Sequence, residues 1–323
     1  MKRILLIEPM HPAGPDLAAA RGGFEVVVAP DPRPETLKRL VGDVHAIGVR
    51  IAPLRREVLE AAPMLEIVSR HGVGCDNVDV EYLTARGIPV AIAAGANADS
   101  VAEHTLMLML AGTRNLIRQD RAVRSGRFAD RDGLVGGDLT GAHALIVGFG
   151  RVGQRVARLC RAFGMRVTVA DVALDRDLAG SMGCAAVTDF REGLGEADFV
   201  CMHLPLNADT RHAMSGAEFA RMKTGAVLVN CARGGVVDEM ALVDALECGR
   251  VACAGIDVFD QEPPPADHPL LGRDDVVLTP HTGAASRGAM REMSRMTFRN
   301  ILDFYDGRLR EDCTFNGAAL RAA

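Results

Sequence analysis

The chain has 323 residues, which is enough for two domains of roughly 150 residues each. Its formal charge of −5 argues against nucleic acid as the main partner, and its 48% hydrophobic and 24% charged residues are typical of a globular protein. The eight cysteines form no C-x-x-C pair, so the sequence favours a reducing, cytoplasmic setting over a zinc ribbon or a thioredoxin-like motif.

The N-terminus superficially resembles a signal peptide, but its apolar run at residues 4–7 stops at Glu8 and is too short for one. We therefore expect a first β-strand there. The most apolar helix candidate, residues 101–112, contains Glu103 and His104 and is far shorter than a membrane span. The sequence predicts no membrane segment.

Short β-rich runs alternate with helical stretches over the first hundred residues. The predicted strands are residues 3–7, 25–28, 46–49, 67–70 and 89–92. The predicted helices are residues 13–20, 35–41, 55–61 and 80–86. This alternation predicts one small α/β domain whose parallel sheet is covered on both faces.

Residues 100–127 have the pattern of one long helix or two, and residues 131–138 are predicted to be a loop. The α/β alternation then resumes, with a helix at 152–163 after the first strand. The predicted strands are residues 144–147, 166–170, 199–203, 226–230, 252–257 and 276–279. Two doubly wound α/β units joined by a long helix are expected, and a last helix at 288–305 is placed to cross back to the first unit.

A glycine-rich turn follows the strand at 144–147 and opens the helix at 152–163. The residues of this motif that we assign to cofactor binding are Gly148, Gly150, Arg151, Val152 and Gly153. The three glycines permit a tight turn, close approach of a pyrophosphate and close packing of helix on strand, while the helix N-terminus attracts phosphate. In this strand–turn–helix context the motif predicts a dinucleotide site.

Asp171 ends the next predicted strand, where a carboxylate can bind the ribose hydroxyls of the dinucleotide. The same charge would repel a 2′-phosphate, and Val172 and Ala173 offer no adjacent Arg. The sequence therefore favours NAD over NADP.

Three chemically competent residues lie just beyond predicted strand ends: Arg233, Glu262 and His281. Ligands bind at the carboxyl ends of parallel strands. Hydride transfer to a keto acid needs a clamp for the carboxylate and carbonyl, a proton donor and a partner that keeps the donor protonated. Taken singly, each residue has an ordinary alternative as a solvated Arg, an exposed Glu or a structural His.

Several segments, in order along nearly the whole chain, resemble the D-2-hydroxyacid dehydrogenase family. These segments are residues 72–79, 100–104, 203–206, 230–238, 257–263 and 279–283. The resemblance implies an α/β fold of two Rossmann-like doubly wound parallel-sheet domains, with the NAD domain inserted into the substrate domain. We expect residues 1–98 and 288–323 to form the substrate-binding domain and residues 99–287 to form the NAD-binding domain.

The resemblance also implies the catalytic roles. Val73 and Gly74 would present backbone N–H groups to the substrate carboxylate. Arg233 would bind the carboxylate and carbonyl of a small 2-keto or 2-hydroxy acid. His281 would be the acid and base, and Glu262 would pair with it so that it is protonated near neutral pH.

The cofactor contacts are implied in the same way. Asp257 and the carbonyl of Cys231 would hold the nicotinamide carboxamide, and Gly283 belongs to the same group. His203 and Pro205 would flank the adenosine, while Thr210 would reach the phosphates. Cys231 has no nearby His or Cys with nucleophile spacing, so its thiol is interpreted as a packing group.

Departures from related families narrow the hypothesis. Formate dehydrogenases of this superfamily have Gln where Glu262 stands, which argues against formate, and phosphite oxidation is a weaker alternative. Phosphoglycerate dehydrogenases resemble the chain but often continue into a regulatory domain, for which we expect no room after Tyr305. In those enzymes the position of Arg50 contacts the far end of the substrate, where it could recognise a second anionic group. The alternative, an ordinary surface Arg, is favoured.

Two further alternatives concern partners. Corepressors that sense NAD(H) keep this fold and cofactor, but the compact length without disordered tails favours a plain enzyme. Residues 114, 118, 121 and 124 are all Arg and place basic groups on one helix face. We interpret that face as solvated or as a subunit contact, with no nucleic acid or membrane partner and a homodimer expected.

Overall fold

The computed structural model describes residues 1–322, and the chain divides into two compact units. Unit 1 comprises Met1–Asn97 and the chain from Ala285 onward, and unit 2 comprises Ala98–Ala284. Unit 2 is therefore inserted into unit 1. None of the described helices is both long enough and apolar enough to span a bilayer.

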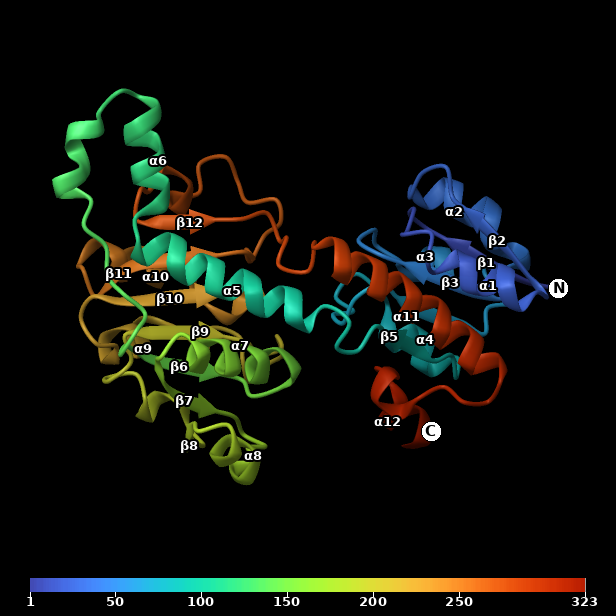
Figure 1. The fold of residues 1–323 in the computed structure, drawn as a ribbon. Coiled ribbons are helices and arrows are strands. Elements are labelled where there is room, and N and C mark those ends of the chain that lie inside the picture. Colours follow the sequence, from blue (N-terminus) through green and yellow to red (C-terminus); the bar gives the residue numbers. More distant parts are fainter. Residues whose placement is uncertain (323) are drawn as a thin grey trace. The chain divides into compact units, whose positions relative to one another are not determined.

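Unit 1 is built on a five-stranded parallel sheet in the order β2-β1-β3-β4-β5 (Figure 1). Its strands are β1 (Lys2–Leu6), β2 (Phe24–Val28), β3 (Ala46–Val49), β4 (Ile67–Arg70) and β5 (Val90–Ile92). Its helices are α1 (Pro15–Arg21), α2 (Pro34–Leu40), α3 (Arg56–Leu59), α4 (Val80–Ala85), α11 (Arg287–Tyr305) and α12 (Gly317–Ala322).

Both faces of this sheet are buried because strand residues alternate between two cores. Ile4 and Ile67 face a core that includes Phe298 of α11, whereas Leu5 and Val68 face the core under α2, α3 and α4. Each fully buried Leu or Ile side chain contributes roughly 1.5–3 kcal/mol. The predicted return of the last helix to the first unit is confirmed, since α11 packs on β4 and β5.

Unit 2 contains a seven-stranded parallel sheet in the order β12-β11-β10-β9-β6-β7-β8. Its strands are β6 (His143–Val147), β7 (Arg166–Ala170), β8 (Ala185–Val187), β9 (Phe199–Met202), β10 (Ala226–Asn230), β11 (Val251–Ile256) and β12 (Val276–Leu278). Its helices are α5 (Ala98–Thr113), α6 (Leu116–Arg124), α7 (Arg151–Ala162), α8 (Arg176–Ser181), α9 (Gly216–Arg221) and α10 (Glu239–Glu247).

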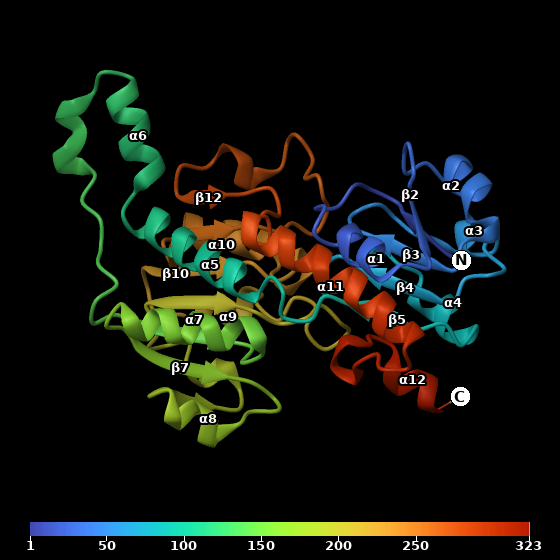
Figure 2. The same ribbon diagram turned by 45° about the vertical axis from the view of Figure 1, so that its right-hand side comes forward.

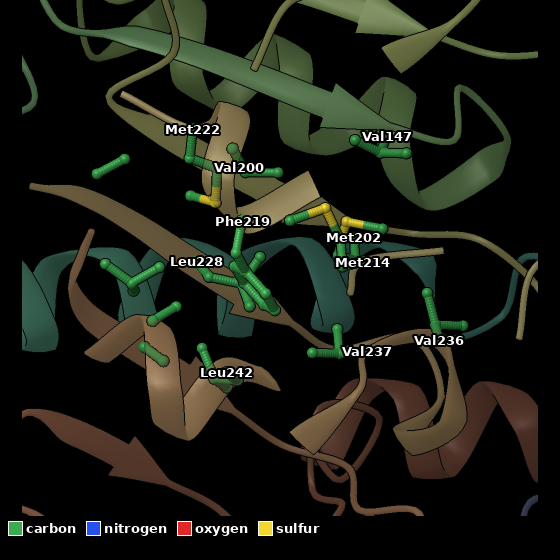
Figure 3. Packing of buried hydrophobic residues seen from close by; sticks show 14 of the residues in the cluster. Val147, Val200, Met202, Met214, Phe219, Met222, Leu228, Val236, Val237 and Leu242 are labelled. Carbon is green, nitrogen blue, oxygen red and sulfur yellow. The ribbon is translucent and has the colours of Figure 1, made fainter. Parts of the chain in front are cut away.

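The sheet of unit 2 is also covered on both faces. Figure 3 shows the face on which Val200 and Leu228 pack against Phe219 of α9 and Leu242 of α10. The opposite face packs on α5, α7 and α8. All the strands run in parallel and their order reverses at β6, so their carboxyl ends meet at one edge beside a topological switch point.

The stretch predicted as one long helix or two is two helices. Asn115 separates α5 from α6 and has φ of 53°, which a helix cannot include. In Figures 1 and 2, α6 and the segment after it project from the sheet of unit 2. The predicted loop at 131–138 is partly wrong, because residues 128–133 form 3₁₀ turns.

Four elements of unit 2 were not predicted from the sequence: β8, α8, α9 and α10. β8 is a three-residue strand at the sheet edge and is only half-buried, so it has little hydrophobic alternation to read. The three helices have between six and nine residues. Their supports are capping groups such as the Asp238 carboxylate at the start of α10.

Candidate active site

The glycine turn between β6 and α7 has the geometry of a phosphate site. Gly148 has φ of 98°, and an added Cβ would lie 2.6 Å from the carbonyl oxygen of His203. A Cβ on Gly153 would lie 1.9 Å from the Gly148 carbonyl oxygen. Gly150, by contrast, faces open space at the N-terminus of α7, where no side chain caps the helix. The helix N–H groups are thus accessible to an anion.

His281 and Glu262 form an ion-pair geometry at the ends of β12 and β11. The Nδ1 atom of His281 lies 2.7 Å from Oε2 of Glu262, and the side chains are 48% and 39% exposed. Because Nδ1 faces a carboxylate, it carries a proton, and Nε2 is the ring nitrogen left for a substrate. Burial alone would raise the pKa of Glu262, but hydrogen bonds from His281 and the Phe259 N–H, with the charge of Arg233, lower it.

Arg233 lies in the loop after β10, and that loop is held by the side chain of Asn230. The Asn230 amide donates to the Arg233 carbonyl at 2.9 Å and accepts from the Ala232 N–H at 3.0 Å. Gly234 presses this loop onto the next, because an added Cβ would lie 1.9 Å from the carbonyl carbon of Phe259. The Arg233 loop and the Glu262 loop are therefore in direct contact.

Asp257 ends β11 and holds the turn that carries His281. One carboxylate oxygen accepts from the Thr279 hydroxyl at 2.6 Å and the Thr282 N–H at 2.8 Å, and the other accepts from the Gly283 N–H at 2.9 Å. Burial raises the pKa of Asp257, yet these bonds and His104 outweigh it and lower the pKa below its ordinary value. The buried carboxylate therefore stays charged and fixes the turn.

His104 on α5 is a site residue that the sequence did not single out. Its Nε2 lies 2.9 Å from the Thr279 hydroxyl oxygen and 3.3 Å from the Asp257 carboxylate. His104 stands in the family-like segment 100–104 but was given no role there. Asn230 was missed in the same way, since it stands in a recognised segment but was given no role.

Comparison with known proteins decides the family. A family model described as "D-isomer specific 2-hydroxyacid dehydrogenase, NAD binding domain" matches residues 106–283. A glyoxylate reductase of Korarchaeum cryptofilum is 38% identical, with 88% of each chain covered. The chain belongs to the D-2-hydroxyacid dehydrogenase family.

Other members of the family show how much of each protein is shared. D-3-phosphoglycerate dehydrogenase of Methanocaldococcus jannaschii is 38% identical over 97% of this chain, but the match spans only 59% of that protein's length. The solved structure of a glyoxylate reductase from Paecilomyes thermophila has a TM-score of 0.85 and 30% identity, over 97% of this chain and 98% of that one. The matched NAD-binding domain of the family lies entirely within unit 2.

Asp171 stands at the end of β7, as predicted for a residue that binds ribose. Its carboxylate oxygens accept from the Phe149 N–H at 2.8 Å and from the Ala173 N–H at 2.9 Å. The carboxylate therefore supports the glycine turn through the N–H of Phe149. Of the other two motif residues, Arg151 begins α7 and Val152 packs against the core beneath that helix.

The loop after β9 contains the residues predicted for the adenosine side. Burial lowers the pKa of His203 to about 4, and its buried Nε2 has no hydrogen-bond partner within the described chain. The Thr210 hydroxyl donates to the Pro205 carbonyl at 2.6 Å and accepts from the Asn207 N–H at 2.9 Å. It thus closes this loop, and its contact with phosphate stays a prediction.

Cys231 follows β10 and is largely enclosed. Burial raises the pKa of its thiol to about 12, so the thiol is uncharged at neutral pH and packs against the core under α5. Within residues 1–322, no three His, Cys, Asp or Glu side chains are grouped so that they could hold a metal ion.

Unit 1 contains the other predicted substrate residues. Val73 and Gly74 lie in the turn after β4, and neither backbone N–H donates a hydrogen bond within the described residues. Arg50 follows β3, in a turn fixed by Glu8, whose carboxylate accepts the N–H groups of residues 50–52 at 2.8–2.9 Å. Burial, with the charges of Arg50 and Arg70, lowers the pKa of His71 to about 4.

The predicted basic helix face does not include Arg114, which precedes α6, and three of the four arginines lie near carboxylates. Arg121 lies 2.6 Å from Asp274, Arg124 lies 2.8 Å from Asp120, and Arg114 lies 3.7 Å from Asp138. Ion pairs of this kind weaken the attraction of a phosphate backbone.

Proposed function

We propose that this protein catalyses the NAD-dependent, reversible reduction of a small 2-keto acid to the D-2-hydroxy acid. The observation that carries the proposal is the His281–Glu262 pair, which lies beside the Arg233 loop in the family's NAD-binding domain. A donor imidazole, a carboxylate that favours its protonated form and a guanidinium are the groups that reduction of a carbonyl requires.

In reduction, NADH bound at the glycine turn would supply a hydride to the carbonyl carbon of the substrate. Arg233 would bind the carboxylate and polarise the carbonyl through its planar fork. Nε2 of His281 would donate a proton to the carbonyl oxygen, which becomes the hydroxyl. Glu262, held as a carboxylate, would stabilise the imidazolium before that transfer, and oxidation would reverse each step.

We propose further that unit 2 binds the cofactor and that unit 1 adds contacts to the substrate. Unit 2, predicted as residues 99–287, would bind NAD through the glycine turn, Asp171 and the loop after β9, with Asp257, Gly283 and the Cys231 carbonyl near the nicotinamide. Unit 1, predicted as residues 1–98 and 288–323, would bind the substrate carboxylate through the N–H groups of Val73 and Gly74. Their available donors support this assignment.

The two arginines Arg50 and Arg70 of unit 1 favour a substrate with a second anionic group. Arg50 and Arg70 both act on buried His71, so two guanidinium groups lie near one point. We expect Arg50→Ala to raise the KM of a phosphorylated or dicarboxylic 2-keto acid by about 10-fold, while the KM of glyoxylate changes little. Arg39→Ala, on the exposed face of α2, is the control. Equal effects on both substrate classes would contradict this proposal.

The proposed reaction is tested by NADH oxidation with a panel of 2-keto acids. The panel contains glyoxylate, hydroxypyruvate, pyruvate, sulfopyruvate, branched 2-keto acids and phosphorylated 2-keto acids. Turnover of at least one of them, with the D-isomer as product, is expected. Absence of turnover across the panel by protein that binds NADH would contradict the proposal.

We also propose a homodimer formed through unit 2. The arm at residues 114–138 exposes Leu116, Ile117 and Phe128, and α5 and α7 enclose an apolar groove of about 540 Å³ whose lining includes Leu110 and Phe163. One unit thus carries both an apolar projection and an apolar groove, which suits a second copy.

Ile117→Asp combined with Phe128→Asp should convert the dimer to monomer in light scattering, while Val28→Asp in unit 1 should not. A wild-type protein that is monomeric would contradict the dimer. The eight cysteines, free in the structure and mostly buried, support the expected reducing, cytoplasmic setting.

A further inference from the structure

Unit 2 contains a further imidazole–carboxylate pair, which has no role in the chemistry proposed above. Nε2 of His268 lies 2.9 Å from Oε2 of Glu239, and the side chains are only 11% and 14% exposed. A substrate therefore cannot reach this pair as it can reach His281. Removal of one partner of a buried pair leaves the other group uncompensated, so each partner constrains the position of the other.

Both carboxylate oxygens of Glu239 accept hydrogen bonds. It begins α10, directly after the loop that contains Arg233 and Gly234, and its Oε1 accepts the backbone N–H of Asp260 at 2.8 Å. His268 is oriented as well, because its Nδ1 accepts the Leu270 N–H at 3.3 Å, which leaves the proton on Nε2 for Glu239. One carboxylate thus joins the start of α10 to both ends of the segment 260–270.

That segment carries Glu262 and needs polar anchors. A largely apolar cavity of about 450 Å³ borders it, lined in part by Phe259, Pro263 and Leu271, so packing on that side does not fix its position. The Phe259 ring meets the His268 ring edge-on with centroids 5.8 Å apart, and the Phe259 N–H donates to Glu262 at 3.1 Å. Short links therefore lead from His268 and Glu239 to the carboxylate that holds His281.

We propose that Glu239 and His268 form a positioning pair that holds Glu262 in register with His281, and that the same contact keeps the Arg233 loop against the Glu262 loop. This inference rests on the proposed function. Its residues touch neither the glycine turn nor the substrate, so their loss should act on the proton-transfer step and leave cofactor affinity intact.

Glu239→Gln keeps the side-chain volume but turns an amide N–H₂ toward one of its two donors, His268 Nε2–H or the Asp260 N–H. We expect kcat to fall by between about 10- and 100-fold, the scale of a misplaced catalytic group, with the Kd of NADH from fluorescence titration unchanged. Glu247→Gln is the matched control, since Glu247 is on the same helix but is 64% exposed and faces Arg273 at 3.7 Å. Equal kcat losses in the two variants would overturn the proposal.

A double-mutant cycle shows whether the effect passes through Glu262. If it does, Glu239→Gln in a Glu262→Gln background should cost less than about 2-fold, because the register it protects is already lost. Full multiplication of the two losses would overturn the proposal.

If Glu239→Gln does not fold, two variants of His268 replace it. His268→Gln keeps a donor near the Nε2 position and is expected to retain most activity. His268→Leu has no donor there and is expected to lose activity. Equal loss in both His268 variants would count against the pair.

Proton NMR separates failure of this inference from failure of the proposed function. The hydrogen-bonded Nδ1 proton of His281 should give a far-downfield signal that is absent in His281→Ala and Glu262→Gln. That signal should disappear in Glu239→Gln and persist in Glu247→Gln, whether or not any keto acid turns over. Persistence of the signal in Glu239→Gln would overturn the inference even in an active enzyme.

Discussion

The two halves of the sheet edge in unit 2 differ in the chemical groups that form them. The turn between β6 and α7 is made of backbone: Gly148 and Gly153 stand where a Cβ would clash, and Gly150 faces open space. The loops after β10, β11 and β12 are made of charged side chains held by other charged or polar groups, as Asp257 holds the turn of His281. The first suits binding of a constant pyrophosphate, and the second suits proton movement.

Because of this difference, substitutions in the two regions should affect different kinetic quantities. Changes at the glycine turn should act on cofactor affinity, and changes at the loops after β10 to β12 should act on kcat. The polar supports of those loops also carry stability, because a buried carboxylate is tolerated only while its donors remain. Each experiment below would break this division or sharpen it.

The largest effect is expected at His281. His281→Ala should lower kcat by at least about 10²-fold, the usual contribution of a general acid, with NADH affinity unchanged. His212→Ala is a matched control, because His212 is similarly exposed and also has positive φ. Steady-state kinetics with near-wild-type kcat in His281→Ala would remove this residue from the mechanism.

The glycine turn should show the opposite pattern. Gly148→Ala places a Cβ 2.6 Å from a backbone oxygen at φ of 98° and should weaken NADH binding by about 10-fold or more. Gly180→Ala, at a site with no neighbouring atom within 4 Å, should bind normally. Fluorescence titration gives both values. Unchanged affinity in Gly148→Ala would show that the turn does not set cofactor binding.

Asp257 tests the polar support of the His281 turn through pH. Its folded pKa lies below the ordinary value of 3.8, so its stabilisation is fully present above that pH and is lost as pH falls through the lower folded value. Asp257→Asn should cost roughly 1–3 kcal/mol near neutral pH, and the gap in thermal midpoint should close in acid. Asp120→Asn, in an exposed ion pair, should show no such gap. A gap that is constant into acid would refute the assignment.

The smallest effect is expected at Asp171. Removing its carboxylate in Asp171→Ala should raise the NADP-to-NAD ratio of kcat/KM by about 5-fold, because a repulsive charge near the 2′-phosphate is lost. The glycine turn loses one support, the bond from the Phe149 N–H, but keeps its three glycines. A wild-type preference for NADP would contradict the role given to Asp171.

The fold was predictable where apolar runs had clear polar boundaries. Strands such as β3, β4, β7 and β10 begin and end where expected, because parallel strands buried on both faces are continuous apolar runs bounded by polar residues. Short edge elements such as β8 were not predicted, because they bury little apolar surface. Two helices were one of the predicted alternatives for residues 100–127, but the position of the break at Asn115 was not predicted, because an unusual φ has no hydrophobic signature.

The parts of the site that are contiguous in the sequence were easier to predict than the parts that the fold brings together. The glycine turn is one continuous motif, so its position followed from sequence and strand context. Arg233, Glu262 and His281 lie in loops after three different strands, and their grouping rested on family resemblance. His104, Asn230 and Glu239 were missed because their roles depend on contacts across loops, such as the bond from Asp260 to Glu239, which no spacing in the sequence encodes.

The most direct test of the central claim follows the hydride itself. The protein is incubated with NADH deuterated at the transferring position of nicotinamide C4 and with each active 2-keto acid, and the product is analysed by mass spectrometry and chiral chromatography. We predict a D-2-hydroxy acid with one deuterium at C2, formed by the wild type and lost in His281→Ala. Undeuterated product, or no hydroxy acid from protein that binds NADH, would contradict the account.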